Sequence, residues 1–383
     1  MKFTCETATL KQACDTAKRA VSGKSNIPAL EGLLLHAYDF CEKDPERTET
    51  IEITGYDLEV SIQTRIDAVV RDPGEWVIDA SLLCGILGKI ADNRVTIEVD
   101  KRAKAIVRGG EAEFKLSATP GKDFPEIPST GNAQRFTIQT DVLQSMIKCT
   151  VFAAAVHKDA KPIHTGVLFE FTEGALTCAA IDGFRLATRH APGGHKGEQV
   201  RFVVPPKALK EIMGLKIEGD TAVYLSRRHI AFGVGGVRGG VRFTSRLLDG
   251  EFMNYRAAIP QDFATEFRVS TRDLLAAIER VSLIIPKEIK TPIVMELCPK
   301  DGSIVISCKT GTGEAQERVS VQGLDLSETI GFNHRFLADA LSACDDDTVT
   351  LRVNGDITPV IIAPPEDDAY MHMILPVRLN KDN

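Results

Sequence analysis

Two short stretches have the residue types of phosphate-binding loops. The tripeptide GKS at 23–25 matches the end of G-x-x-x-x-G-K-[ST], but the first glycine of that motif would fall at Lys18. The residues after it predict an extended strand, where such a loop requires a helix. The glycine-rich run at 233–240 does not fit G-x-G-x-x-G, because its sixth position is Arg238 and a strand follows. We therefore predict no nucleotide site in either stretch and a hairpin tip in the second.

Acidic residues, histidines and thiols are the other candidates for catalysis or metal binding. The acidic run CDDDT at 344–348 separates an expected helix from an expected strand, which favours a solvated turn. The histidines form no H-x-x-x-H pair beside an acid, and the nine cysteines never form C-x-x-C. The Asp-Gly pair at Asp182 predicts a structural turn. We expect no metal, no cofactor and no catalytic residue; an enzyme that uses Asp182 and Arg185 at a domain interface stays open as an alternative.

The composition narrows the class of protein. A chain of 383 residues fits two or three domains, and 43% hydrophobic with 26% charged residues is ordinary for a globular protein. The sequence contains no run of about 18 apolar residues, so we expect no membrane span. The stretch MKFTCETATLKQ has no signal-peptide pattern. Scattered cysteines favour reduced thiols, so we expect a cytoplasmic protein.

Positive charge is concentrated on the expected helices. Their six windows hold 11 basic and 6 acidic residues in a chain of net charge −7. The windows are 8–21, 80–91, 141–155, 206–216, 272–284 and 334–344. Such a face suits the backbone of DNA or RNA, although a solvated surface explains the same excess.

Helical periodicity places these cations opposite the apolar residues. In the first helix we expect an inward stripe of Leu10, Ala13, Cys14 and Ala17, which leaves Lys11, Lys18 and Arg19 on the other face. In the fourth helix we expect Leu209, Ile212 and Met213 to point inward and Lys207 and Lys210 outward. Cys149, like Cys14, falls on an apolar helix position and is expected to be buried.

One strand–helix unit occurs three times. MKFTCETATLKQACDT opens the chain, QRFTIQTDVLQSMIKC spans 134–149, and TEFRVSTRDLLAAIER spans 265–280. Phe3, Phe136 and Phe267 share the spacings 133 and 131 with Leu10, Leu143 and Leu274. Each third predicts two helices and about eight strands. We therefore predict an α+β fold of three similar domains, at 1–125, 130–256 and 262–383.

These features together resemble the bacterial DNA polymerase III β subunit, the sliding clamp. The resemblance rests on the three copies, on MKF at the start, on IDGFRLA in the middle copy, on FTSRLLDGEFMNY at 243–255 and on MILPVRL at the end. It implies three DNA-clamp domains that form half of a six-domain homodimeric ring around duplex DNA. It further implies a non-enzymatic processivity factor without cofactors, whose partners are the replicative polymerase, the clamp loader and other clamp-motif proteins.

The resemblance also implies site residues. The DNA-binding positions are Lys11, Lys18, Arg19, Lys24, Lys148, Lys158, Lys207 and Lys210. The hydrophobic peptide-binding pocket is implied at His164, Ile181, Gly183, Phe184, Arg185, Leu186, Met253, Val360, Met373, Ile374, Leu375, Pro376, Val377 and Arg378, with the two arginines at its rim. The dimer interface is implied at an edge strand with Ala105, Ile106 and Val107, and at Leu283 and Ile284.

Four pocket positions depart from the family pattern. The family usually has Thr at Ile181, a His- or Tyr-like residue at Phe184, Leu near His164, and Pro at Met253. These departures allow a second interpretation, a divergent clamp paralogue with an altered set of partners. Lengthened hairpins at 38–50 and 235–240 and the added tail NKDN also differ from the family.

Overall fold

The computed structural model describes residues 1–38, 50–131, 133–192, 199–214, 219–235, 240–286 and 291–379. The centres of both predicted long hairpins, at 39–49 and 236–239, and the tail at 380–383 lie outside the described residues. Among the described residues, no helix has the length and apolarity that a membrane crossing requires.

The described residues form six α-helices and 25 strands, in three runs that share one order except for the additional strand β5 in the first. The first run, called the first copy, contains β1 (Lys2–Glu6), α1 (Thr7–Lys18), β2 (Gly32–Ala37), β3 (Thr50–Tyr56), β4 (Val60–Asp67), β5 (Val69–Asp72), β6 (Gly74–Asp79), α2 (Ala80–Leu87), β7 (Arg94–Val99), β8 (Lys104–Gly109) and β9 (Ala112–Pro120). The second copy contains β10 (Gln134–Gln139), α3 (Thr140–Val151), β11 (Val167–Thr172), β12 (Ala175–Ile181), β13 (Arg185–Pro192), β14 (Val200–Val204), α4 (Pro206–Met213), β15 (Asp220–Leu225), β16 (His229–Val234) and β17 (Val241–Arg246). The third copy contains β18 (Thr265–Ser270), α5 (Thr271–Ser282), β19 (Ile293–Cys298), β20 (Ser303–Thr310), β21 (Gly313–Gln322), β22 (Thr329–Phe332), α6 (His334–Ala343), β23 (Thr348–Val353), β24 (Val360–Ala363) and β25 (Tyr370–Ile374).

The repeated residues have the structural roles that their spacing predicts. Phe3, Phe136 and Phe267 are 0%, 3% and 1% exposed on the first strand of each copy. Leu10, Leu143 and Leu274 are fully buried on the helix that follows. Short polar side chains begin several helices: Ser270 Oγ accepts the backbone N–H of Asp273 at 3.2 Å, and Asp79 Oδ1 accepts that of Leu82 at 2.7 Å. The predicted α+β repeat is confirmed.

The helix faces agree with the prediction except at one residue. Cys14 and Cys149 are buried, as are Leu209 and Ile212. The predicted inward position of Met213 is wrong, because this side chain is 37% exposed. Met213 is the last residue of α4, so no further helical turn covers it.

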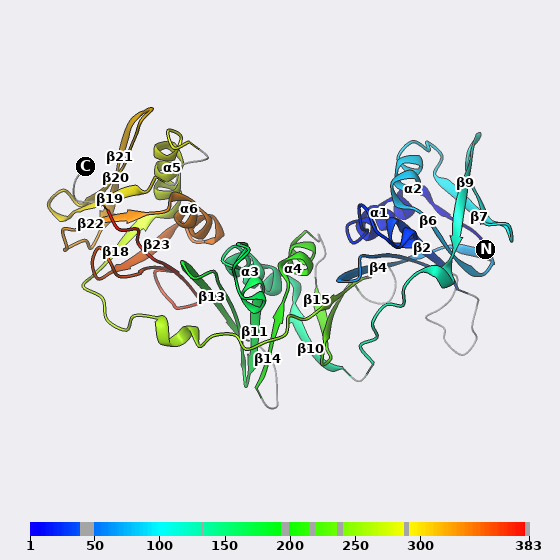
Figure 1. Ribbon diagram of the computed structural model, residues 1–383, viewed down its shortest axis with the longest axis horizontal. Helices are drawn as coiled ribbons and strands as arrows, with labels where there is room; N and C mark the ends of the chain where they lie inside the picture. The colour runs from blue at the N-terminus through cyan, green and yellow to red at the C-terminus, as the bar shows by residue number, and fades with distance from the viewer. Residues whose placement is uncertain are drawn as a thin grey trace. The chain divides into compact units, whose positions relative to one another are not determined.

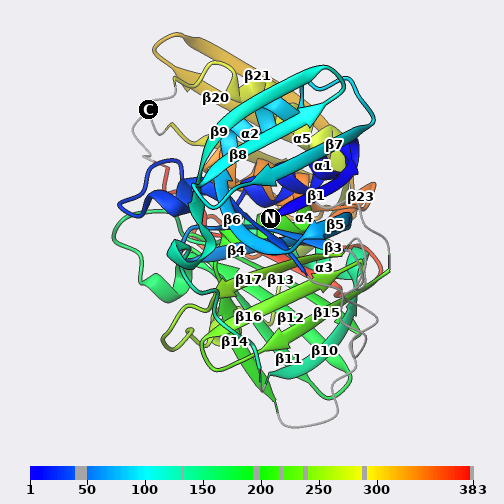
Figure 2. The same ribbon diagram turned by 90° about the vertical axis from the view of Figure 1, so that its right-hand side faces the viewer.

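The strands are organised in two compact units, one of residues 1–143 and 207–247 and the other of 144–206 and 248–383. The first unit has a sheet of order β10-β15-β16-β17-β4-β3-β2-β6-β9-β8-β7-β1-β5, on which α1 packs against β3 and β4 (Figures 1 and 2). The second unit has a sheet of order β14-β11-β12-β13-β25-β24-β23-β18-β21-β20-β19-β22.

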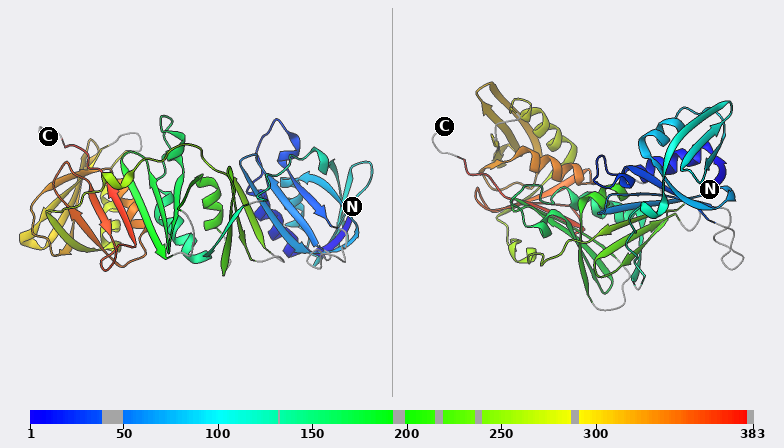
Figure 3. Two further views of the ribbon diagram at one scale, coloured as in Figure 1. Left: turned by 90° about the horizontal axis from the view of Figure 1, so that it is seen from below. Right: turned by 45° about the vertical axis from the view of Figure 1, so that its right-hand side comes forward.

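Each sheet is continuous from one copy into another. In the first unit, β17 pairs antiparallel with β4 through five residue pairs, from Val241↔Thr64 to Ser245↔Val60; we call this pairing the first joint. In the second unit, β13 pairs antiparallel with β25 through five pairs, from Arg185↔Ile374 to Arg189↔Tyr370, and we call it the second joint (Figure 3). The second copy thus contributes strands to both sheets. The domain boundaries predicted from the sequence stay a prediction.

Candidate binding surfaces

The motif IDGFRLA forms a tight turn at the second joint. Asp182 Oδ1 accepts the backbone N–H groups of Phe184 at 2.9 Å and Arg185 at 3.0 Å. Gly183 has φ +87°, a conformation that favours glycine. The predicted structural turn is therefore confirmed. It presents Phe184, which is 56% exposed, and the Phe184 carbonyl accepts the N–H of Leu375 at 2.9 Å.

Arg185 is part of the wall of this region, and its predicted place at an open rim is wrong. Its side chain is 9% exposed; Nε donates to Asp182 at 2.9 Å and a terminal nitrogen donates to Asp339 at 2.6 Å. The guanidinium also lies over the rings of Phe336, at 4.5 Å, and Phe152, at 5.4 Å. Charge pairing and stacking together hold Arg185 in place.

These contacts reveal three residues that the sequence interpretation missed. Phe336 stacks on Phe184 with ring centroids 6.1 Å apart, and Asp339 and Phe152 hold Arg185. The sequence signal for Phe336 was an aromatic residue in the first turn of the helix that follows the dipeptide FN. No motif in the second copy indicates that Phe184 would contact it. Asp182 and Arg185, the residues of the alternative enzymatic interpretation, pair with each other at 2.9 Å and stabilise this turn.

The predicted pocket residues fall into two groups by exposure. Ile181, Leu186, Val360, Met373 and Ile374 are at most 6% exposed and belong to the core. Phe184, Met253, Leu375 and Val377 are 37–56% exposed apolar side chains. Gly183 and Arg378 are exposed, and His164 and Pro376 are intermediate. The exposed group can contact a ligand directly, whereas the buried group supports it from below.

The buried group is divided between two clusters. Ile181, Leu186 and Met373 pack with Phe252 and Tyr255 of the linker. Val360 and Ile374 belong instead to the core of the third copy. His164 lies edge-on to Phe252, with ring centroids 5.4 Å apart, and burial together with Lys161 lowers its pKa.

The predicted DNA-binding residues are all at least partly exposed, but half of them have carboxylate partners. Lys11 pairs with Asp15 at 2.6 Å, and Arg19, Lys148 and Lys207 pair with Glu211, Asp345 and Asp57. For Lys18, Lys24, Lys158 and Lys210 the described residues supply no ion pair, and the last three are exposed. The helix charge counted from the sequence therefore overstates the free positive charge.

The prediction that Ala105, Ile106 and Val107 lie on an edge strand is wrong. Ala105, Ile106 and Val107 lie on β8, which pairs with β7 on one side and β9 on the other, so it is not an edge. Ala105 and Val107 are fully buried. The neighbouring strand β9 has an open edge over most of its length, because among the described residues it joins β6 only through its last three residues. Leu283 is 82% exposed, in agreement with a role at a surface, and Ile284 packs partly on the core.

Comparison with known proteins identifies the family. The N-terminal, central and C-terminal domains of the DNA polymerase III beta subunit match residues 1–128, 137–254 and 256–378. The chain belongs to the DNA polymerase III beta-subunit family. This result confirms the family predicted from the repeats and motifs.

Relatives in this family match over the whole chain. The beta sliding clamp of Bacillus subtilis is 28% identical over 390 residues, which cover 99% of this chain and 100% of the relative. The crystal structure of a DNA polymerase sliding clamp from Bacillus subtilis has TM-score 0.90 at 29% identity, and covers 99% of this chain and 100% of that chain. A sliding clamp structure from Pseudomonas aeruginosa has TM-score 0.87 at 26% identity with the same coverage. The roles of individual residues of this chain stay predictions.

Proposed function

We propose that two copies of this chain close into a ring around duplex DNA and act as a cytoplasmic sliding clamp for a replicative polymerase, a clamp loader and other clamp-binding proteins. One observation carries this proposal: the pairing scheme of the three copies is incomplete. Strands β4, β13 and β21 occupy the same place in the three copies, and so do strands β9, β17 and β25. A strand of the first set can pair with a strand of the second set that belongs to another copy. In one chain β4 pairs with β17 and β13 pairs with β25. One strand of each set, β21 and β9, is left over.

Both leftover strands have open edges over most of their length. Within the described residues, 112–117 of β9 pair only with β8, and 313–320 of β21 pair only with β20. If β21 of one chain pairs with β9 of a second chain, and the reverse, the open N–H and C=O groups of these strands gain partners. The two chains then close a ring of six domains. On β9, Phe114 and Leu116 are only partly buried against the core, which leaves apolar area for such a contact.

Sedimentation of the full chain tests ring closure. We expect a dimer at micromolar concentration and a shift to monomer in Leu283→Asp, because a carboxylate would enter the apolar contact beside β21. Ile357→Asp is the matched control, since Ile357 is also exposed, at 69%, but lies in the β23–β24 turn. A wild-type monomer at all concentrations contradicts the ring. A dimeric Leu283→Asp contradicts only the position of the interface.

Retention on DNA tests the topological function. After loading by a clamp loader, the chain should stay on nicked circular DNA in high salt, which weakens direct phosphate contacts, and should leave when the circle is cut. Release from circular and linear DNA at equal rates contradicts encirclement.

We further propose that the exposed group at the second joint binds short peptides with Leu and Phe anchors. Phe184, Met253, Leu375 and Val377 supply apolar area above a rigid core, an arrangement typical of peptide recognition. Calorimetry with a Gln-Leu-x-Leu-Phe peptide should give micromolar binding to the intact chain. Ile357→Ala should bind equally, and Met253→Ala more weakly.

The altered-partner interpretation has one structural observation in its favour. Phe184 stacks on Phe336, so an aromatic pair stands where the family usually has a His- or Tyr-like residue. If Phe184→His gains affinity for the Gln-Leu-x-Leu-Phe peptide, the natural pocket is tuned to other sequences. An unchanged or lower affinity argues against a divergent partner set.

A further inference from the structure

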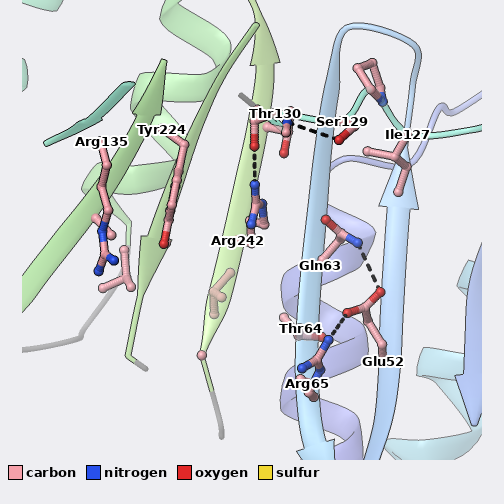
Figure 4. Close-up of a pocket in the computed structure, with 18 of the residues that line it drawn as sticks. Glu52, Gln63, Thr64, Arg65, Ile127, Ser129, Thr130, Arg135, Tyr224 and Arg242 are labelled. Carbon is pink, nitrogen blue, oxygen red and sulfur yellow. Dashed lines mark hydrogen bonds and ion pairs between the residues drawn. The ribbon is translucent and has the colours of Figure 1, made fainter. Parts of the chain in front are cut away.

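The first joint carries a cavity of about 930 Å³ on the sheet face opposite α1. The faces are distinguished by Thr64, whose hydroxyl donates to the carbonyl of Ala13 in α1. The neighbouring Gln63 and its cross-strand partner Arg242 therefore point to the other side. The cavity spreads over β3, β4, β10 and β15–β17, and linker residues 127–131 cross it (Figure 4).

Three side chains form a row across this cavity. Arg135 and Tyr224 are direct cross-strand partners, and Arg242 reaches Tyr224 from β17 across Gly233. The guanidinium carbons lie 5.7 Å (Arg135) and 5.0 Å (Arg242) from the centroid of the Tyr224 ring. Figure 4 shows all three side chains in the opening. Because the planar groups rest on the ring, their N–H edges remain available for an anion.

The charge around this row is not balanced by nearby carboxylates. Arg242 donates to the Thr130 hydroxyl, and among the described residues neither Arg135 nor Arg242 has a carboxylate partner. Glu52 also lines the cavity, but Arg65 and Gln63 each donate to it at 3.0 Å. Asp220 is four residues from Tyr224 on β15, roughly 13 Å along the strand. The end of the cavity at Tyr224 is therefore basic.

A third arginine offers a further donor on the same face. The side chain of Arg65 is 28% exposed, and its Nε is buried without a hydrogen-bond partner in the described part of the chain. Buried N–H groups are normally satisfied, so this Nε can donate to an acceptor in the cavity. Thr137 and Thr244 also line the cavity and can add neutral contacts.

We propose that this cavity binds a small molecule that carries two or more phosphates, of the nucleoside di- and triphosphate class. The volume lies within the range of small-molecule pockets, about 300–1,000 Å³. Guanidinium forks match phosphate oxygens in pairs, and several arginines match several phosphates. The free face of the Arg135 guanidinium, on the exposed side of the row, can stack on a base. The bound molecule would connect the β3–β4 hairpin of the first copy to strands of the second.

Titration calorimetry of the full chain with GTP and with sodium tripolyphosphate, in buffer without sulfate, tests this proposal. We expect saturable binding at millimolar or lower concentration and a ligand-dependent rise in melting temperature. Arg135→Gln and Arg242→Gln should each weaken binding about tenfold, since each removes one charge-assisted contact. Arg228→Gln is the control, because Arg228 is exposed in the β15–β16 turn and does not line the cavity.

A second variant blocks the space without changing charge. A Cβ at Gly233 would lie 3.7 Å from Tyr224, an ordinary contact, so Gly233→Val should fold and fill the cavity between Tyr224 and Arg242. It should abolish binding of both probes while the melting temperature without ligand stays close to that of the wild type.

The two probes distinguish a nucleotide from an inorganic polyphosphate as the ligand. Tighter binding of GTP than of tripolyphosphate assigns a nucleotide, and equal binding assigns an inorganic polyphosphate. Absence of binding at millimolar concentration, or equal binding by wild type and an Arg135→Gln/Arg242→Gln double variant, overturns the proposal. Binding of a hexaglutamate peptide but of neither phosphate probe also overturns it, in favour of an acidic segment of a protein.

Discussion

The two joints use the same backbone scheme with opposite side-chain chemistry. Each joins two strands of different copies through five antiparallel pairs. Each has one face toward a helix, since Thr64 bonds the Ala13 carbonyl of α1 and His372 bonds the Cys149 carbonyl of α3. On the face away from the helix, the first joint presents Arg242 and Gln63 to an open cavity. At the second joint the corresponding face contains Leu186 and Met373, packed under the linker. Pairing geometry therefore builds both joints, whereas the side chains on this face differ: they are charged and open to a cavity at the first joint, and apolar and covered at the second.

The linkers differ in the same way. Linker residue Tyr255 donates its hydroxyl to the buried carboxylate of Glu170 at 2.9 Å, and Arg256 donates to the same group at 2.7 Å. The first linker is held by one hydrogen bond, from the Arg242 guanidinium to the neutral hydroxyl of Thr130, and by Phe124 packed near Tyr56. We expect the second joint to depend on buried charge pairs and the first to tolerate loss of its charges.

The largest expected effect comes from removing one arginine at each joint. Arg185→Met leaves Asp182, 9% exposed, without its cation, and should lower the free energy of unfolding by about 3 kcal/mol or more. Arg242→Met should lower it by less than about 1 kcal/mol, because its partner is a neutral hydroxyl. Urea denaturation measures both. Equal losses would show that the two joints are not held differently.

A buried histidine at the second joint should make this joint sensitive to acid. Burial lowers the pKa of His372 to about 4, and its Nε2 bonds the Cys149 carbonyl at 3.0 Å. The unfolded chain, with a histidine pKa near 6.5, binds more protons below that pH, so stability is lost as the pH falls from about 6.5 to 4. The shift corresponds to roughly 3 kcal/mol at most.

Denaturant midpoints at pH 7, 5.5 and 4.5 measure this effect. His372→Gln, which keeps an N–H donor, should be less stable at pH 7 but should lose less stability on acidification than the wild type. His157→Gln is the control, since His157 is exposed. Parallel curves for wild type and His372→Gln would assign the acid sensitivity to other groups.

The sequence predicted the fold well because its signals are local and repeated. Phe3, Phe136 and Phe267 mark the same strand three times, and helical phase located Leu10 and Cys14 in the core. The buried and exposed faces of most elements follow such periodicity. The prediction for Met213 was wrong because the burial of a helix-terminal residue depends on the path of the chain beyond the helix, which periodicity does not determine.

The sites were predicted less completely because they depend on pairing between distant segments. Lys207 is part of a basic helix face in the sequence, but Asp57, 150 residues away, pairs with it. β8 and β9 have similar alternation, so only the observed ladder distinguishes the edge. The row of Arg135, Tyr224 and Arg242 has no motif, because three strands bring it together.

A smaller effect should show whether Phe184 contacts the peptide or only stabilises the second joint. Phe184→Ala should weaken the Leu/Phe-anchored peptide by roughly tenfold to thirtyfold, which is typical of an aromatic anchor. Its effect on the free energy of unfolding should be below about 1 kcal/mol, because the side chain is 56% exposed. Tyr224→Ala at the first joint should leave peptide affinity unchanged. If both variants lose affinity, the joints do not have separate ligands.

The smallest expected effect concerns two lysines of α4 beside the first joint. Lys207 pairs with Asp57, whose carboxylate also accepts the backbone N–H of Val60 at 2.7 Å, so this lysine is engaged by the β3–β4 turn. Lys210 is exposed on the same helix. If Lys210 contacts a DNA phosphate, Lys210→Gln should make the plot of log DNA affinity against log salt concentration less steep by about 1. Lys207→Gln should change the steepness by less. Lys207→Gln should instead change unfolding by less than about 1 kcal/mol, the range of exposed ion pairs. A larger change in slope for Lys207→Gln would mean that DNA displaces Asp57, and the pair would then act as a switch at the first joint instead of a fixed support.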